Sequence, residues 1–338
     1  MLLSLQGKGF TGATTNGPSA FRTPRAILPF PFCGSVPQTH IDHAGRPSPR
    51  PPNLLSAIGR IKGLSKRLTT AIIFVVIMVA GHYTGPYVFA GLFFIIAAGC
   101  LWEFFGLTLD LHTRRDRIRK VFGTVLGLLP FVLVTILSVG KVSDPETFIT
   151  LASALFSPAV FTIFIYELYS HSREPFANVA FMILGLFYIG VPFALVNFIA
   201  FDGDDFKARI VLGLLVLTWV NDTGAYLTGS MFGKTPLFPR ISPNKTWEGS
   251  TGGVVTCLVF GYLLSLFFTE IPTAQWLGLA VIVSIFGSLG DLVESMLKRS
   301  VKVKDSGNLL PGHGGLLDRF DAFIFVIPFA SAYLLYLR

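Results

Sequence analysis

Charged residues are scarce in this chain of 338 residues, of which Asp, Glu, Lys and Arg make up 14%. Soluble domains carry about 25% charged residues, so the deficit argues against a soluble globular protein. Cysteine is also scarce, and Cys33, Cys100 and Cys257 have neither the spacing of a metal site nor the number that a disulfide framework needs. No internal repeat is present. Apolar residues, in contrast, make up 52% of the chain, including 33 Phe.

The apolar residues fall into runs close to the length of 20 residues that crosses a bilayer core roughly 30 Å thick. Runs such as "AIIFVVIMVA" lack the polar face that a helix in a soluble core shows every 3.6 residues. We therefore predict an all-α, polytopic integral membrane protein with about nine transmembrane helices. The expected spans are 69–83, 86–107, 121–140, 147–168, 177–200, 210–231, 252–269, 273–297 and 320–337.

Basic residues are distributed unevenly between the connections of these spans. Four alternate connections, "HTRRDRIRK", "YSHSREP", "GKTPLFPRISPNKTWEG" and "KRSVKVKDSGNLLPGHGGLLDR", hold 14 Lys and Arg. The opposite connections hold only Lys141, Lys207 and Arg209. Because short basic loops stay on the cytoplasmic side, we predict that the N-terminus is cytoplasmic and that the C-terminus lies outside.

Residues 1–67 differ in composition from the rest of the chain. They hold nine Lys or Arg against one acid, Asp42, and nine of the 21 prolines. This excess accounts for the net charge of +8, so the basic character of the chain does not indicate a nucleic-acid partner. We predict a disordered extension, with residues 68–338 forming the membrane-embedded domain. A transit peptide, an unstructured tail and an over-extended start all remain open for the extension.

Polar residues within the predicted spans gather in residues 210–325, the predicted catalytic half. Polar groups inside a membrane are energetically expensive and are therefore functional candidates. In "TWVNDTGAYLTGSMFGK", Asn221 and Asp222 lie well inside the span, and Tyr226 falls on the face of Asp222. Helix–helix hydrogen bonding is the alternative for this pair. In the first half, we expect Glu103 and Asn197 to be interfacial side chains.

A stripe of small residues in the same span, Ala225, Gly229 and Gly233, lets a neighbouring helix approach closely, within the chain or in a dimer. The loop that follows, "LFPRISPNKTWEGS", offers hydroxyls, an amide and cations that suit an anionic ligand such as phosphate. These residues are Arg240, Ser242, Asn244, Lys245 and Thr246.

Carboxylates gather around the last two spans. In "GSLGDLVESMLKRS", helical spacing places Asp291, Glu294, Ser295 and Lys298 on one face. Asp318 and Asp321 then stand at the start of the last helix. Acids there are favoured by the helix dipole, which is a structural alternative. Carboxylates from separate helix ends can also close around a hard divalent cation together with phosphate oxygens. We therefore predict a metal site.

The stretch "SMLKRSVKVKDSGNLLPGHGGLLDRFD" resembles the signature of the phosphatidate cytidylyltransferases (CDP-diacylglycerol synthases), and "WVNDTGAYLTGSMFGKTPLFPRISPNKTWEGS" is also similar to that family. The matching positions of the signature are Ser295, Lys298, Arg299, Lys304, Asp305, Gly307, Pro311, His313, Gly314, Gly315, Asp318, Arg319 and Asp321. The resemblance implies a reaction of phospholipid biosynthesis in which CTP and phosphatidic acid give CDP-diacylglycerol and pyrophosphate.

The resemblance also implies roles for individual residues. Asp291, Asp318 and Asp321 would bind Mg²⁺, with a second cation such as K⁺ beside it. Nucleotide phosphates would be held by Ser242, Asn244, Lys245 and Thr246. The triphosphate and the lipid headgroup would be neutralised by Lys298, Arg299, Lys304, His313 and Arg319, of which Lys298, His313 and Arg319 are expected in the catalytic set. The cavity would be lined by Asn221, Asp222 and Tyr226.

Several expectations concern the surroundings of the enzyme. CTP, phosphatidic acid and the lipid bilayer are the expected partners, with no nucleic acid. A homodimer is compatible with the small-residue stripe. We expect a location in the inner cell membrane, or in a plastid membrane if the extension is a transit peptide. The alternative function is that of a CTP-dependent lipid kinase of the polyprenol or phytol type, which would transfer the γ-phosphoryl group to an alcohol.

Overall fold

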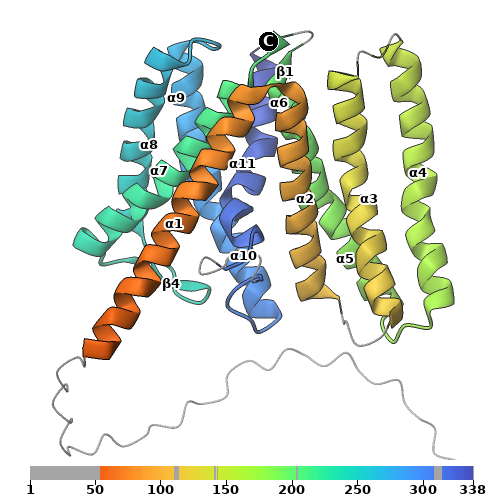
Figure 1. The fold of residues 1–338 in the computed structure, drawn as a ribbon, viewed down its shortest axis with the longest axis horizontal. Helices are drawn as coiled ribbons and strands as arrows, with labels where there is room; N and C mark the ends of the chain where they lie inside the picture. Colours follow the sequence, from red (N-terminus) through yellow and green to blue (C-terminus); the bar gives the residue numbers. More distant parts are fainter. Residues whose placement is uncertain are drawn as a thin grey trace, which may run out of the picture. The chain divides into compact units, whose positions relative to one another are not determined.

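The computed structural model describes residues 54–109, 114–140, 142, 144–202, 205–307 and 314–337, with side chains described from Thr69 onward. Helices dominate these residues (Figure 1), because a chain in lipid must satisfy its backbone hydrogen bonds internally. The helices are α1 (Leu54–Thr84), α2 (Pro86–Thr108), α3 (Arg114–Val139), α4 (Pro145–Ser170), α5 (Pro175–Gly185), α6 (Val191–Ala200), α7 (Ala208–Phe232), α8 (Trp247–Phe267), α9 (Thr273–Ile282), α10 (Ser288–Ser300) and α11 (Leu317–Tyr336).

Eight helical segments in the described part of the chain are long and apolar enough to cross a membrane. They are Pro86–Thr108, Arg114–Val139, Pro145–Ser170, Pro175–Ala200, Ala208–Phe232, Trp247–Phe267, Thr273–Ser300 and Leu317–Tyr336. Each coincides with one of the predicted spans. The remaining predicted span, 69–83, lies in α1, whose apolar part is the shorter segment Thr69–Thr84. The prediction of an all-α polytopic membrane protein is therefore confirmed.

Two of the spans contain a π-helical turn that the sequence pattern does not reveal. The turn Leu186–Gly190 joins α5 to α6, and the turn Val283–Gly287 joins α9 to α10. π-turns within helices are frequently found at functional sites. The second turn ends directly before α10, the helix that carries Asp291 and Glu294.

The loop between α7 and α8 forms a β-hairpin. Strands β3 (Pro236–Phe238) and β4 (Ser242–Thr246) pair antiparallel, with Pro236 opposite Thr246. The side chain of Glu248 closes the base of the hairpin, since it accepts hydrogen bonds from the backbone N–H groups of Lys234 and Thr235. Thr246 caps α8 by accepting a hydrogen bond from the Gly249 N–H at 3.1 Å. A second short pair, β1 (Phe201–Asp202) and β2 (Asp205–Phe206), connects α6 to α7.

The small-residue stripe of α7 is used for packing within the chain. α7 packs closely along α8, and a Cβ atom added to Gly249 of α8 would lie 2.8 Å from the carbonyl oxygen of Ala225. Gly229 faces Gly249 in the same contact. The absence of side chains at these positions allows the two backbones to approach, which fixes α7 relative to the hairpin and to α8.

α11 packs against α2, α6, α7 and α10 near the middle of the bundle, whereas α4 lies at its edge against α3 and α5 (Figure 1). Aromatic contacts set the rotation of α11, because the buried rings of Phe320 and Phe323 contact Phe193 and Phe93 at centroid distances of 6.1 and 6.3 Å. These rings flank Asp321 in the sequence. Their burial therefore determines the direction in which Asp321 projects.

The ends of the helices place the polar segments together. The ends of α2, α4, α7 and α10 and the starts of α3, α5, α8 and α11 all lie at the same end of the bundle (Figure 1). The segments of the sequence that join these helix pairs are the four that are rich in Lys and Arg. The start of α11 and the end of α10 are at this basic end, and α11 terminates at the opposite end (Figure 1).

Candidate active site

Three carboxylates from two helices meet at the start of α11. Asp291 and Glu294 lie three residues apart on α10, and Asp321 belongs to α11. One oxygen from each of them lies within 4.8 Å of the others. Glu294 is fully buried, and Asp291 and Asp321 are half-buried. We call these three residues the carboxylate cluster.

The carboxylate cluster has the chemistry that a hard divalent cation requires. Oxygen ligands from carboxylates are those that Mg²⁺ prefers. Oε1 of Glu294 is buried and has no hydrogen-bond partner among the described residues, whereas buried carboxylate oxygens are ordinarily paired. A cation bound between the three groups would satisfy this oxygen and offset their mutual repulsion. The residues present therefore fit a metal ion.

Lys298 links the carboxylate cluster to Asp318. Its Nζ lies 2.8 Å from Oε2 of Glu294 and 2.8 Å from Oδ1 of Asp318. Asp318 also accepts hydrogen bonds from the backbone N–H groups of Ser306 and Gly315, each at 3.0 Å. Asp318 thus ties the loop before α11 to the first turn of that helix. The structure groups Glu294 rather than Asp318 with Asp291 and Asp321, and the metal-binding role of Asp318 stays a prediction.

A cavity of about 570 Å³ opens beside the carboxylate cluster. It is formed by α7, β4, α8 and the start of α10, and Asp291 belongs to both the cavity and the cluster. The predicted site residues that line it are Asp222, Tyr226, Asn244, Lys245, Thr246 and Asp291. Residues from three separate motifs therefore meet in one cavity, whose volume is in the range of small-molecule sites, roughly 300–1,000 Å³.

Lys245 connects the hairpin to α10. Its Nζ lies 2.5 Å from Oδ2 of Asp291 and donates a hydrogen bond to the carbonyl oxygen of Ser288 at 3.2 Å. Both side chains are about one-quarter to one-third exposed, at 26% and 34%. The ammonium group therefore stands at the border between the cavity and the carboxylate cluster, where a polyphosphate would need a cation.

Other predicted site residues lie outside the cavity lining. Asn221 is buried, with 1% exposure, beside Gly253 and Gly287, and its amide atoms have no hydrogen-bond partner in the described part of the chain. Ser242 lies at the start of β4 opposite Phe238. Arg299, Lys304 and Arg319 are exposed at the basic end. His313 lies outside the described residues.

Glu103 reaches this region from the first half of the chain. It lies on α2 with 5% exposure, and its Oε2 accepts hydrogen bonds from the Leu317 N–H at 2.8 Å and from Oγ of Ser306 at 3.4 Å. A Cβ atom on Gly307 or Gly315 would collide with its carboxylate. The expectation of an interfacial side chain is therefore wrong for Glu103. The two glycines of the signature are the signal that a bulky group from elsewhere packs there.

The expectation of an interfacial side chain is also wrong for Asn197, at the other end of the bundle. It is fully buried, and its Nδ2 donates a hydrogen bond to Oγ1 of Thr135 at 2.6 Å. This amide links α6 to α3. Its role is in helix packing, because a buried polar group in a membrane protein needs a partner on a neighbouring helix.

Comparison with known proteins points to one family. The sequence model of the cytidylyltransferase family matches residues 65–337. A phosphatidate cytidylyltransferase of Staphylococcus aureus (strain COL) is 39% identical over 216 residues, which cover 63% of this chain and 81% of the relative. A phosphatidate cytidylyltransferase of Bacillus subtilis (strain 168) is 35% identical over 268 residues, which cover 79% of this chain and 96% of the relative.

Proposed function

We propose, because this chain belongs to the cytidylyltransferase family, that it is the enzyme that converts CTP and phosphatidate to CDP-diacylglycerol and pyrophosphate. It is an integral membrane nucleotidyltransferase of phospholipid biosynthesis. The main structural support for this function is that the hairpin, α7 and α10 line one cavity beside the carboxylate cluster.

In the reaction, an oxygen of the lipid phosphate attacks the α-phosphorus of CTP. A new P–O bond forms there, the bond to the β-phosphate oxygen breaks, and pyrophosphate leaves with the electron pair. The attacking phosphate is already an anion, so the site needs no strong general base. Catalysis of such a transfer consists mainly of positioning and of stabilising charge.

The cations around the cavity would supply this stabilisation. Lys245 lines the cavity and pairs with Asp291, where it would contact the nucleotide phosphates. Asn244 and Thr246 line the same wall. Arg299, Lys304 and Arg319 are exposed at the basic end and would neutralise the triphosphate or the lipid headgroup. We retain His313 as a predicted member of this set on the basis of the sequence signature alone.

Asp291, Glu294 and Asp321 would hold Mg²⁺, since their oxygens converge and one of them lacks a partner among the described residues. When bound, the ion would withdraw charge from the phosphate oxygens and lower the barrier to substitution at phosphorus. Asp318 would keep Lys298 and the loop in place through its three hydrogen-bond partners, Lys298, Ser306 and Gly315, or would join the ligand set as the sequence signature implies. A monovalent ion such as K⁺ beside Mg²⁺ remains part of the proposal.

The distribution of charge supports a proposed orientation of the chain. The helix ends joined by the four Lys- and Arg-rich segments lie at one end of the bundle (Figure 1), and such loops stay in the cytoplasm. CTP would then reach the site from the cytoplasm, while the acyl chains of phosphatidate would enter sideways between the helices. The related proteins are bacterial, and we propose an inner-membrane location with the C-terminus outside.

The reaction is tested with CTP labelled on either the α- or the γ-phosphate, phosphatidate in detergent micelles, Mg²⁺ and the purified full chain. The proposal predicts that only the α-label enters the lipid phase, with release of pyrophosphate. Transfer of the γ-label to polyprenol or phytol, without α-label transfer to phosphatidate, would instead establish a lipid kinase. The relatives are named as cytidylyltransferases, which does not favour that alternative.

A further inference from the structure

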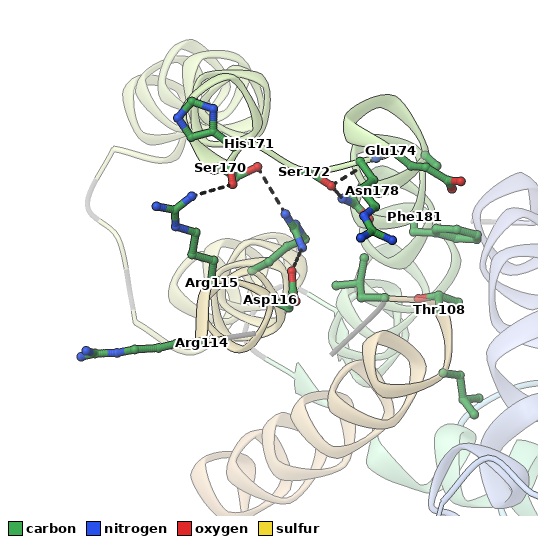
Figure 2. A pocket seen from close by; sticks show the side chains of 15 residues that line it. Thr108, Arg114, Arg115, Asp116, Ser170, His171, Ser172, Glu174, Asn178 and Phe181 are labelled. Atoms are coloured by element: carbon green, nitrogen blue, oxygen red, sulfur yellow. Dashed lines mark hydrogen bonds and ion pairs between the residues drawn. The ribbon is translucent and has the colours of Figure 1, made fainter. Parts of the chain in front are cut away.

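A second polar cavity lies in the first half of the chain, away from the residues of the candidate active site. It has a volume of about 850 Å³ and is enclosed by the ends of α2, α3, α4 and α5. Figure 2 shows Arg115, Ser170, His171, Ser172 and Asn178 around it. We call it the α3–α5 pocket. It shares no lining residue with the active-site cavity.

The floor of the α3–α5 pocket is a fixed network around Arg119. This arginine is 2% exposed and donates hydrogen bonds to Glu167 through Nε and to Asp116 through Nη1, the latter at 2.6 Å. Asn178 adds hydrogen bonds to Oγ of Ser172 at 2.7 Å and to Glu167 at 3.4 Å. Arg119 thus engages both acids of the floor. The network joins three helices and holds the pocket in one shape.

The wall of the α3–α5 pocket is cationic. Arg115 donates one hydrogen bond to the carbonyl oxygen of Ser170 at 3.2 Å, and a guanidinium group has five N–H donors. Arg114, Arg173 and His171 line the same space and are exposed. Glu174 is the exposed acid on this wall. Its side chain makes no capping hydrogen bond at the start of α5, and the arginines of the wall outnumber this acid.

The surroundings of the α3–α5 pocket indicate a lipid ligand. Only 6% of the spanning part of α4 is buried within the protein, so lipid covers most of this helix. Tyr169 and Phe176, 74% and 77% exposed, stand on either side of the connection from α4 to α5. Tyrosine is enriched at the level of the headgroups, so Tyr169 indicates that this connection lies near the membrane surface. Basic pockets between transmembrane helices on the cytoplasmic side suit anionic headgroups.

We propose that the α3–α5 pocket binds the phosphate headgroup of an anionic glycerophospholipid of the surrounding membrane. Arg115 and Arg173 contact the phosphate, and the acyl chains lie along the exposed face of α4. The site is separate from the one that takes phosphatidate as a substrate. The enzyme therefore binds a membrane lipid at a second site, outside its active site.

The test uses the full chain in detergent, with dioctanoyl phosphatidylglycerol as the anionic probe and dioctanoyl phosphatidylcholine as the zwitterionic probe. Lipid retention is counted by native mass spectrometry. The double substitution Arg115→Gln/Arg173→Gln should reduce retention of the anionic lipid by roughly 30-fold, the product of about fivefold for each arginine near an anionic headgroup. Retention of phosphatidylcholine should not change. Arg117→Gln, which alters an exposed arginine of α3 outside the pocket, is the matched control.

Unchanged retention of phosphatidylglycerol in the double variant would overturn the proposal, as would equal retention of the two lipids by the wild type. Arg173→Gln alone, in the exposed connection, repeats the test if the double variant does not elute as a folded protein. A second experiment uses inorganic phosphate as the probe, to distinguish a soluble phosphate from a lipid headgroup. If millimolar phosphate raises the melting temperature through Arg115 and Arg173 while phosphatidylglycerol is not retained, the pocket takes a soluble phosphate and the lipid assignment fails.

Discussion

Oε2 of Glu103 on α2 accepts a hydrogen bond from the backbone N–H of Leu317, the first residue of α11, at 2.8 Å. The two residues are 214 positions apart. The bond satisfies one of the free N–H groups at the start of a helix, and the carboxylate lies at the positive end of the helix dipole. A side chain from the apolar first half thus fixes the start of the helix that carries Asp318 and Asp321.

Substitution of Glu103 tests this link. Glu103→Ala should lower the free energy of unfolding by about 1–3 kcal/mol, because buried N–H and hydroxyl donors lose their acceptor. It should also reduce turnover, since the start of α11 would no longer be fixed. Glu103→Gln keeps an acceptor oxygen and should recover most of both quantities. Thermal unfolding and the α-label assay provide the measurements. An alanine variant as stable and active as the wild type would show that the bond has no positioning role.

Lys298 is predicted to link the carboxylate cluster, through Asp318, to the loop that precedes α11. Lys298→Met leaves Glu294, which is fully buried, and Asp318 without their common cation, and breaking a buried pair in this way costs about 3–5 kcal/mol. Adding Asp318→Asn should restore part of the stability, because one of the uncompensated charges is removed. Unfolding in detergent measures both. Lys302→Met, at an exposed position, is the control, and additive effects of the two substitutions would contradict the bridge.

Lys245 is predicted to compete with a metal ion for Asp291. Because its Nζ lies 2.5 Å from Oδ2 of Asp291, Lys245→Gln should let Mn²⁺ bind about two- to fivefold more tightly in the absence of nucleotide, the size expected of a partly exposed pair. Turnover should fall, since the triphosphate loses a cation. Mn²⁺ binding is followed by electron paramagnetic resonance, with Lys234→Gln as the control. Weaker Mn²⁺ binding in Lys245→Gln would contradict this role.

The spans and the cavity residues could be predicted from the sequence, and for the same physical reason. A bilayer imposes a fixed length on apolar helices and makes every polar residue within them conspicuous. Asp222, Tyr226 and Asp291 are visible in this way, and the structure brings them into one cavity. Their meeting point depends on the packing of α7 against α8, which the small residues of α7 also suggest.

Glu103, the π-turns and the hairpin could not be predicted in the same way. The role of Glu103 depends on a contact across 214 residues, for which local spacing carries no signal. A π-turn arises from tertiary packing within an otherwise apolar helix, so its residues do not interrupt the hydropathy pattern. The hairpin is closed by Glu248 on α8, a residue that reads as an ordinary acid in the first turn of a helix.

Of the predicted extension 1–67, residues 54–67 are helical as part of α1, which corrects the expected disorder there. Residues 1–53 lie outside the described residues, and the prediction for them comes from composition. Their removal should leave turnover in membranes within roughly twofold of the full chain, because a terminal segment rich in Pro and basic residues contributes little to a packed core. The α-label assay with isolated membranes, normalised to the amount of inserted protein, measures this. A large loss of turnover at equal insertion would assign the extension a function in the enzyme.

The central claim is that Asp291, Glu294 and Asp321 hold the metal ion used in catalysis. It is tested most directly by Mn²⁺ binding and α-label transfer in Glu294→Gln and Asp321→Asn, with Asp205→Asn at an exposed position of β2 as the control. The account predicts that both variants elute as folded protein, lose the tight Mn²⁺ site and keep less than a tenth of wild-type turnover, a loss above ~1.4 kcal/mol of transition-state stabilisation. Retention of tight Mn²⁺ binding together with more than a tenth of the activity would contradict it.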